Sequence, residues 1–501
     1  MQLRIATDQP WDVAADVLAI PVVGAVSFEG MLDELDRRSG GELRALAAFG
    51  ELTEKRYDAA LAAAGTLPVQ RVLAVAAGEQ ADLDRETVQR LGASIERRLG
   101  GRNVHSLAIW IGDLASTIDG GVAVVVELLS RGVVEGTYEP KSIYLADVPS
   151  APPLLDELIL IVPGGDATSL LAAAVRGQIF GEGANTARNL ANRASNDVSP
   201  AVLADEAATI AARHGLWIDV IEPERATALG MGMFMAVGRG SDNPPRMIVL
   251  RSGAAGELDA LGRHLAIVGK GVCFDSGGIS IKSADRMDEM KMDKTGAATV
   301  IAAIETVARL APGTPLLAVA PAVENMPGPH STRPGDVVRA LNGKMVDITN
   351  TDAEGRLILG DALTYAERLG ATHLVDVATL TGAVGRALGG LVTGTFGTPQ
   401  AWHDEVMAAG RRAGERYWQM PLVDDYVRDM DSWYGDLQNS GTADGSLIRS
   451  GLFLREFVRR PWVHLDIGGT GYFRKPLPFA SRGANGVTHA TLVELALAGA
   501  R

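Results

Sequence analysis

Short apolar runs alternate with amphipathic segments along most of the chain, and this alternation limits the possible folds more than any other feature. In the first third, runs at 17–23, 72–76 and 107–110 have the length and composition of buried strands. Between them, apolar residues recur at helical spacing over 88–99. Strands that alternate with helices predict an α/β fold, in which helices cover a parallel or mixed sheet.

A proline-containing stretch at 149–153 and a strand-like run at 158–162 that ends in Pro-Gly-Gly mark a domain boundary. We therefore predict an N-terminal α/β domain over residues 1–165 and a larger α/β domain over 166–501. The larger domain is expected to begin with a helix over 169–192. Its further predicted strands lie at 247–250, 265–272, 316–323 and 373–378, and its predicted helices at 297–310 and 357–369.

Charge and cysteine content exclude several classes of function for these 501 residues. The net charge is −14 and no basic tract offsets it, which disfavours a nucleic-acid partner. The single cysteine, Cys273, excludes an internal disulfide and Cys-rich metal sites, as is typical of a reducing cytoplasm. Near the N-terminus, acidic residues lie where a signal peptide would have its apolar core. No apolar run in the chain reaches the ~20 residues that span a bilayer. We expect a soluble cytoplasmic protein without a membrane partner.

The densest group of chemically active residues lies at 350–356, which contains Asp352, Glu354 and Arg356. If this piece is extended, the three side chains share one face, because successive strand residues alternate. A solvated surface edge is the alternative explanation. However, the segment continues into an apolar helix, which draws its end into the interior, and buried carboxylates need cationic partners.

A second group lies upstream, with Lys270 and Asp275 in a glycine-rich segment and Lys282 and Asp293 after it. Lys270 and Asp275 are five residues apart, so they converge only if the glycines interrupt the strand. Asp293 precedes a predicted helix and, taken alone, is more simply explained as its N-cap. Gly-Lys-Gly at 269–271 lacks the spacing of a phosphate-binding loop.

Together the two groups offer four carboxylates, two lysines and one arginine, and no His-Glu-x-x-His motif occurs in the chain. Oxygen-rich ligation suits divalent ions from Mg²⁺ and Mn²⁺ to Zn²⁺. Four carboxylates fit a pair of metals, roughly 3.5–4 Å apart, better than a single ion. The residues by themselves therefore predict a two-metal hydrolytic site.

The run Asn-Thr-Asp-Ala-Glu-Gly-Arg-Leu at 350–357 resembles the signature of the leucyl aminopeptidases, the cytosolic dinuclear-metal aminopeptidases. A segment at 189–197 resembles the start of that family's catalytic domain. The resemblance is close over about 165–500 and holds only by pattern over 1–165. It implies a macro-like N-terminal α/β domain, an α/β/α catalytic domain with a central mixed sheet, and a homohexamer. Six further motifs match in the same order: 268–272 with 274–278, 324–327, 333–336, 376–382, 421–422 with 424–426, and 464–467.

The resemblance also implies roles for individual residues. Two divalent ions, Mn²⁺ or Zn²⁺, would be held by Lys270, Asp275, Asp293, Asp352 and Glu354. Two further residues, Lys282 and Arg356, would be catalytic. Lys282 would stabilise the gem-diolate, and Arg356 would hold a bicarbonate ion that relays a proton. The implied substrates are peptides with a free N-terminus, with a leucine-type preference for the first residue.

The chain departs from the family pattern at Lys294-Thr295, where an apolar residue is usual, and at Gly468-Gly469, where Ala-Gly is more common. We expect Lys294 to face solvent, with an effect on substrate preference as the alternative. Two rival functions stay open at this point. One is a two-metal phosphoesterase, and the other is a macro-like module that binds ADP-ribose or nucleic acid beside a degenerate hydrolase. Degeneration should remove ligands, and none is missing here.

Overall fold

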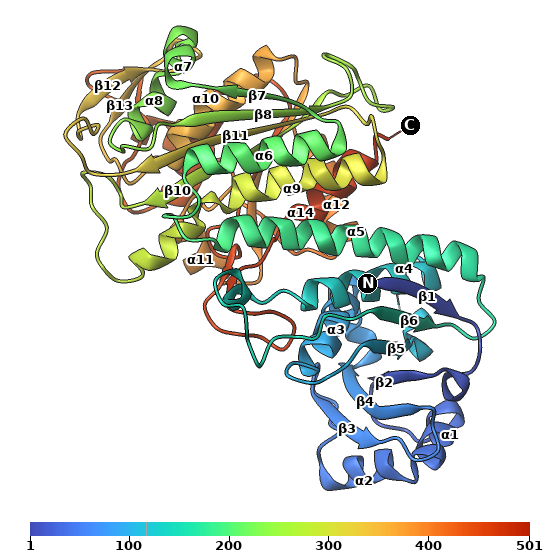
Figure 1. The fold of residues 1–501 in the computed structure, drawn as a ribbon. Helices are drawn as coiled ribbons and strands as arrows, with labels where there is room; N and C mark the ends of the chain where they lie inside the picture. The colour runs from blue at the N-terminus through green and yellow to red at the C-terminus, as the bar shows by residue number, and fades with distance from the viewer. Residues whose placement is uncertain (117, 501) are drawn as a thin grey trace. The chain divides into compact units, whose positions relative to one another are not determined.

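The computed structural model describes residues 1–116 and 118–500 (Figure 1). The chain forms two compact units: residues 1–185 with 475–482, and residues 186–474 with 483–501. The boundary predicted after residue 165 lies just before helix α5 (Ala167–Asn192), whereas the two units divide within this helix. In the first unit, Phe479 of the returning segment packs edge-on against Tyr57, with ring centroids 5.5 Å apart.

The first unit is built on a six-stranded sheet in the order β1-β6-β5-β2-β4-β3. All neighbouring strands are parallel except β3, which pairs antiparallel with β4. Helices α3 (Arg85–Arg98) and α4 (Gly121–Gly136) bury their apolar residues in a core on one face, and α1 (Gly30–Ser39) and α2 (Glu42–Phe49) contribute to a second core. The strands are β1 (Gln2–Ala6), β2 (Ala15–Val23), β3 (Ala59–Ala63), β4 (Val69–Gly78), β5 (Ser106–Trp110) and β6 (Glu157–Ile161).

Glu96 on α3 is a fully buried acid in this unit. Neither of its carboxylate oxygens has a hydrogen-bond partner among the described residues. A Cβ on Gly136 of α4 would lie 2.8 Å from the Glu96 Cβ, so the two helices approach closely here. Burial raises the pKa of Glu96 to about 8, and Arg97 opposes this only in part.

We expect Glu96→Gln to remove a pH dependence of stability. The folded state keeps a proton on Glu96 that the unfolded chain releases near the ordinary glutamate pKa of 4.5. The free energy of unfolding should therefore fall as pH rises from about 4.5 to about 8, by roughly 1.4 kcal/mol per pH unit. Denaturant midpoints at pH 5.5 and pH 8 test this, with Glu51→Gln at an exposed position as control. Equal pH dependence in wild type and Glu96→Gln would contradict it.

The second unit contains a nine-stranded sheet in the order β16-β15-β18-β14-β9-β11-β8-β7, with β10 paired to β11. The strands β18, β14, β9 and β11 are parallel, whereas β8, β7 and β15 run antiparallel to a neighbour. The predicted central mixed sheet is therefore confirmed. The strands are β7 (Trp217–Ile221), β8 (Arg246–Ser252), β9 (Leu265–Gly269), β10 (Gly271–Asp275), β11 (Leu316–Asn325), β14 (His373–Ala378), β15 (Thr393–Thr398), β16 (Tyr417–Gln419) and β18 (Trp462–Asp466).

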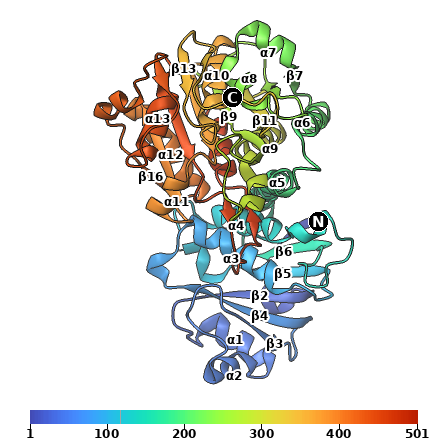
Figure 2. The same cartoon turned by 90° about the vertical axis from the view of Figure 1, so that its left-hand side faces the viewer.

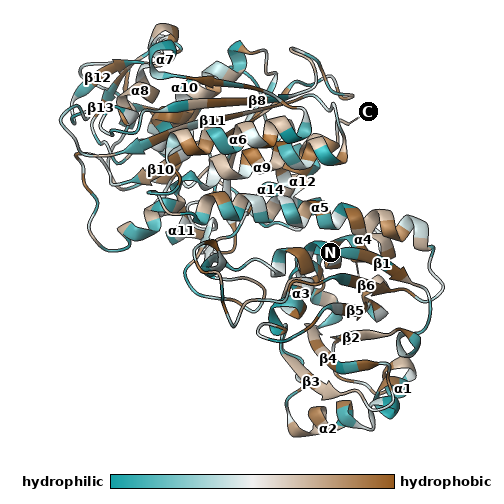
Figure 3. Ribbon diagram, in the orientation of Figure 1, coloured by the Kyte–Doolittle hydropathy of each residue, from teal (hydrophilic) through white to brown (hydrophobic). Residues whose placement is uncertain are grey.

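Helices cover both faces of this sheet, which gives the predicted α/β/α layers (Figures 1 and 2). Helix α6 carries separate polar and apolar stripes, as expected for a helix between sheet and surface (Figure 3). A smaller sheet joins β12 (Asp336–Arg339), β13 (Met345–Ile348) and β17 (Leu437–Gln438). One layer contains α6 (Pro200–His214), α9 (Thr295–Leu310), α12 (Gln400–Ala413) and α14 (His489–Leu497), and the other α8 (Gly232–Gly238), α10 (Gly355–Arg368) and α13 (Ser446–Arg455).

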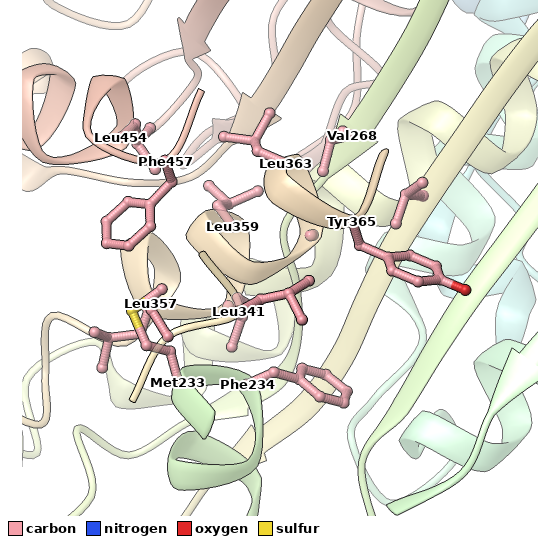
Figure 4. Close-up of a cluster of buried hydrophobic side chains, with 14 of the residues drawn as sticks. Met233, Phe234, Val268, Leu341, Leu357, Leu359, Leu363, Tyr365, Leu454 and Phe457 are labelled. Carbon is pink, nitrogen blue, oxygen red and sulfur yellow. The ribbon is translucent and has the colours of Figure 1, made fainter. Parts of the chain in front are cut away.

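Helix α10 is anchored in the core of this second layer (Figure 4). Its apolar residues Leu357, Leu359 and Leu363 pack in one buried cluster with Phe234 and Phe457. At roughly 1.5–3 kcal/mol for each fully buried large apolar side chain, this cluster holds the start of α10 in a fixed place. The chemically active segment 350–356 ends at that start. Within the part of the chain that the structure describes, no helix is long and apolar enough to cross a membrane.

Candidate functional site

Lys270 lies in a break between two strands. The segment 265–272, predicted as one strand, is divided into β9 and β10 at this residue. The Lys270 N–H donates to the Val377 carbonyl at 3.0 Å, and its carbonyl accepts from the Ala297 N–H at 2.7 Å. A Cβ on Gly296 would lie 2.7 Å from the Lys270 nitrogen, so a glycine lets α9 begin against this break. The interruption lets the Lys270 side chain reach the carboxylates of Asp293 and Glu354.

The segment 350–354 is a turn and not an extended strand, so the expectation of an extended segment is wrong. The Asn350 side chain accepts from the Asp352 N–H at 2.9 Å, and the Asn350 carbonyl accepts from the Ala353 N–H at 3.3 Å. Helix α10 begins directly afterwards at Gly355. Asx turns of this kind offer the backbone an alternative to strand pairing.

Four carboxylates and two ammonium groups lie together beside the start of α10. We call them the acidic cluster: Asp275, Asp293, Asp352, Glu354, Lys270 and Lys282. The Lys270 Nζ lies 2.8 Å from both Asp293 Oδ2 and Glu354 Oε1. The Lys282 Nζ lies 2.7 Å from Asp275 Oδ2, and 2.5 Å from an oxygen of Asp352. These ion pairs leave two negative charges unbalanced. A Cβ on Gly355 would lie 2.8 Å from the Lys270 Nζ, so only a glycine leaves room for this side chain.

The same cluster has the geometry of a cation site. One oxygen each of Asp275, Asp293 and Glu354 lies within 4.8 Å of the others, and all three residues are buried. Glu354 Oε2 has no hydrogen-bond partner among the described residues. Buried oxygens with excess negative charge fit a divalent cation, because an uncompensated carboxylate costs several kcal/mol in the interior.

The pKa values reflect the same crowding. Burial raises the pKa of Asp275, with repulsion from Glu354 and Asp293 added to it. Burial also raises the pKa of Asp293 to about 6. Burial alone would lower the pKa of the Lys270 ammonium, but the three surrounding carboxylates together raise it. The pKa of Lys282 is raised in the same way against the effect of burial. Further positive charge would let all these carboxylates ionise.

Arg356 lies beside the cluster on the first turn of α10. Its Nη1 donates to the Asn439 carbonyl at 2.9 Å, and its Nη2 donates to Ser450 Oγ at 2.7 Å. Its buried Nε has no partner among the described residues. Burial lowers the pKa of Arg356 to about 10, with the nearby Glu354 acting in the opposite direction. The guanidinium therefore retains a donor for a small anion.

At 293–294 the structure excludes the alternative explanation of Asp293 as a helix cap, and the expectation that Lys294 faces solvent is wrong. Asp293 does not cap α9, which has no side-chain cap, because its carboxylate is bonded to Lys270 and to Thr379. Lys294 does not face solvent but is fully buried. Its Nζ donates to the carbonyls of Arg193 at 2.8 Å and Lys291 at 2.6 Å. The ammonium is thereby held by carbonyls at the end of α5 and in the 3-10 helix over 287–294.

Three residues at the site were not singled out from the sequence. Thr379 contacts both Lys270 and Asp293. Asn325 donates to Asp275 Oδ1 at 2.8 Å, and Asn439 donates to the Asn350 carbonyl at 2.7 Å. Thr379 and Asn325 lie within motifs that support the family resemblance, at 376–382 and 324–327. These motifs could have drawn attention to both residues, but they do not indicate which residues the two contact.

Comparison with known proteins matches both parts of the chain to one family. The model of the cytosol aminopeptidase family catalytic domain matches residues 185–493, and that of the family's N-terminal domain matches residues 20–142. A probable cytosol aminopeptidase of Solibacter usitatus is 41% identical over 499 residues, which cover 99% of each chain. Another from a Geobacter species is 37% identical over 498 residues, with the same coverage.

Two solved structures share the whole fold. A mutant of tomato leucine aminopeptidase superposes with a TM-score of 0.88 at 28% identity, covering 99% of this chain and 96% of that one. The bottromycin maturation enzyme BotP in complex with Mn superposes with a TM-score of 0.81 at 32% identity, covering 97% of this chain and all of that one. Both matches include the two α/β units.

Proposed function

The chain belongs to the cytosol aminopeptidase family, and we propose that its buried acidic cluster holds the two metal ions of a peptide-bond hydrolase. Membership makes it a metal-dependent aminopeptidase that removes residues from the amino end of peptides. The observation that carries the assignment of the site is the convergence of four carboxylates with only two ammonium groups.

The ligands follow from the contacts in this cluster and from the family resemblance. In this proposal Asp352, through its carboxylate and its carbonyl, would hold one divalent ion, Mn²⁺ or Zn²⁺. Lys270 and Asp293 would hold the other, and Asp275 and Glu354 would contribute to both. When bound, such ions supply an activated water and polarise the scissile carbonyl. The protein contributes a buried, pre-arranged donor set, which spares the cost of collecting these charges from water.

Lys282 is suited to stabilise negative charge on the substrate. Its side chain is 23% exposed, whereas that of Lys270 is 3% exposed, so Lys282 borders the space open to substrate. Burial alone would lower its pKa, but the carboxylates of Asp275, Glu354 and Asp352 raise it and so favour the ammonium form. In the proposed reaction this ammonium donates to the carbonyl oxygen as it gains charge in the gem-diolate.

Arg356 is suited to hold a bicarbonate ion. The contacts with Asn439 and Ser450 fix the guanidinium, and the buried Nε is left as a donor. Bicarbonate, when bound there, supplies a base for the proton of the attacking water. Arg356 holds the anion by charge-assisted hydrogen bonds, which are about twice as strong as neutral ones.

The remaining parts of the proposal rest on the relatives. Peptides with a free amino terminus are the substrates, with a leucine-type preference at the first residue. A homohexamer is proposed from the family resemblance, and a cytoplasmic location from the names of the curated relatives.

We expect removal of metal to abolish peptidase activity. Dialysis against a chelator should eliminate hydrolysis of Leu-p-nitroanilide, and added Mn²⁺ or Zn²⁺ should restore it, because without the ions no group activates the attacking water. Circular dichroism before and after dialysis shows whether the fold persists. Full activity in protein that elemental analysis shows to be metal-free would contradict the proposal.

The same preparations distinguish an aminopeptidase from a phosphoesterase. Free peptides should lose residues one at a time from the amino end, and N-acetylated peptides should be poor substrates. Rapid cleavage of blocked peptides at internal bonds, or preferential hydrolysis of p-nitrophenyl phosphate, would point to a different enzyme.

A further inference from the structure

Thr379 contacts two members of the acidic cluster at once. It follows the last residue of β14 and is largely buried. Its Oγ1 donates to Asp293 Oδ1 at 2.6 Å, and its carbonyl accepts from the Lys270 Nζ at 3.0 Å. Lys270 and Asp293 are the two residues that the proposed function assigns to the same metal and not to the other.

The chain around Thr379 is held in place independently of the cluster. Asp466 Oδ1 accepts from the N–H groups of Leu380 and Thr381, at 3.2 and 3.3 Å. Asp466 Oδ2 accepts from the Thr381 hydroxyl at 2.7 Å. Asp466 is on strand β18, where it pairs in register with Ala378 of the neighbouring strand β14. The two groups that Thr379 presents to the cluster are therefore positioned before any ligand binds.

We propose that Thr379 is a positioning residue that sets the affinity of one of the two metals, an inference that rests on the proposed function. Its hydroxyl occupies Oδ1 of Asp293 and leaves Oδ2 for the ion. A lysine that coordinates a metal must be a neutral amine with two N–H groups and one lone pair. Donation of one N–H to the Thr379 carbonyl fixes the direction of that lone pair. Outer partners of this kind orient metal ligands and raise their basicity.

The bridging ligand and the ligand of the other metal have different supporting contacts. Asp275, which would bridge both ions, accepts through Oδ1 from Asn325 and from the Gly277 N–H at 2.9 Å. The Asp352 carboxylate is paired with Lys282. Neither set includes Thr379. Loss of its hydroxyl should therefore affect the two metals unequally, which a general loosening of the fold would not do.

The test compares Thr379→Val, which has the same shape without the hydroxyl, with Thr379→Ser, which restores it. Thr299→Val is the matched control, because the buried Thr299 hydroxyl on α9 has no partner among the described residues. Mn²⁺ titration of the metal-depleted proteins by calorimetry, with metal content by elemental analysis, reports each site. We expect Thr379→Val to keep one tight site and to weaken the other about 10- to 100-fold. Thr379→Ser and Thr299→Val should resemble wild type.

Two tight sites in Thr379→Val, or equal weakening of both, would overturn the inference. Thr379→Ala removes the hydroxyl without a substitute methyl group and must show the same unequal loss, which keeps the test valid if the valine variant folds poorly. Wild-type protein that binds fewer than two ions would overturn the proposed function and this inference with it. Two ions in wild type and in Thr379→Val alike would overturn this inference alone.

Discussion

Replacing Glu354 with Gln should remove bound metal and lower kcat by at least about 10³-fold. Glu354 is buried at the centre of the acidic cluster, where its oxygens lie close to those of Asp275 and Asp293. Loss of an outer partner typically costs 10- to 100-fold in metal affinity or activity, and loss of a bridging ligand should cost more. Metal content and steady-state kinetics on Leu-p-nitroanilide measure both effects. Asp352→Asn should behave in the same direction.

The control is Asp285→Asn. Asp285 lies in the same region of the chain but is exposed, and it pairs with Arg286 beside it. Its replacement should leave metal content and turnover unchanged. If Glu354 and Asp352 bound no metal and acted as ordinary surface carboxylates, their replacement would change stability by only about 0.5 kcal/mol and leave activity intact. Near-normal turnover in both variants would therefore refute the assignment of the site.

Lys270→Arg should empty one metal site, leave the other largely occupied and reduce activity severely. An ammonium has no lone pair, so Lys270 must lose a proton in order to coordinate. Burial alone would lower its pKa, the carboxylates of the cluster raise it, and the positive charge of bound ions would offset the carboxylates. Arginine keeps charge and reach but cannot practically deprotonate. Elemental analysis of the purified variant, together with its turnover, measures the result.

A second variant at position 270 distinguishes loss of the metal-binding amine from a steric effect of the larger arginine side chain. Gly355 lies against the Lys270 side chain, so the larger guanidinium could displace the turn before α10. Lys270→Met has a similar unbranched chain without charge or nitrogen, and it should lose the same metal as Lys270→Arg. Two tightly bound ions with good turnover in Lys270→Arg would show that Lys270 acts only as a charge partner for Asp293 and Glu354.

The fold class and the family could be predicted from the sequence alone. Strands and helices such as β14 and α9 coincide with their predicted ranges to within about two residues. This succeeds because the alternation of apolar and polar residues records which face each element buries. The residue types of a two-metal hydrolase were also evident, and the family and enzyme class that they indicated are confirmed. The individual ligand roles stay predictions until the variants above are measured.

The contacts within the site join residues far apart in the sequence and could not be predicted from it. Lys270 contacts Thr379, and Arg356 contacts Asn439, across separations of 109 and 83 residues. The burial of Lys294 was likewise not predictable, because it depends on a hydrogen bond from its ammonium to the carbonyl of Arg193. Periodicity describes one element at a time, whereas hydrogen-bond partners depend on how strands and helices pack against each other. A lone lysine in a polar stretch therefore resembles a solvated one until the carbonyls that it must satisfy are placed beside it.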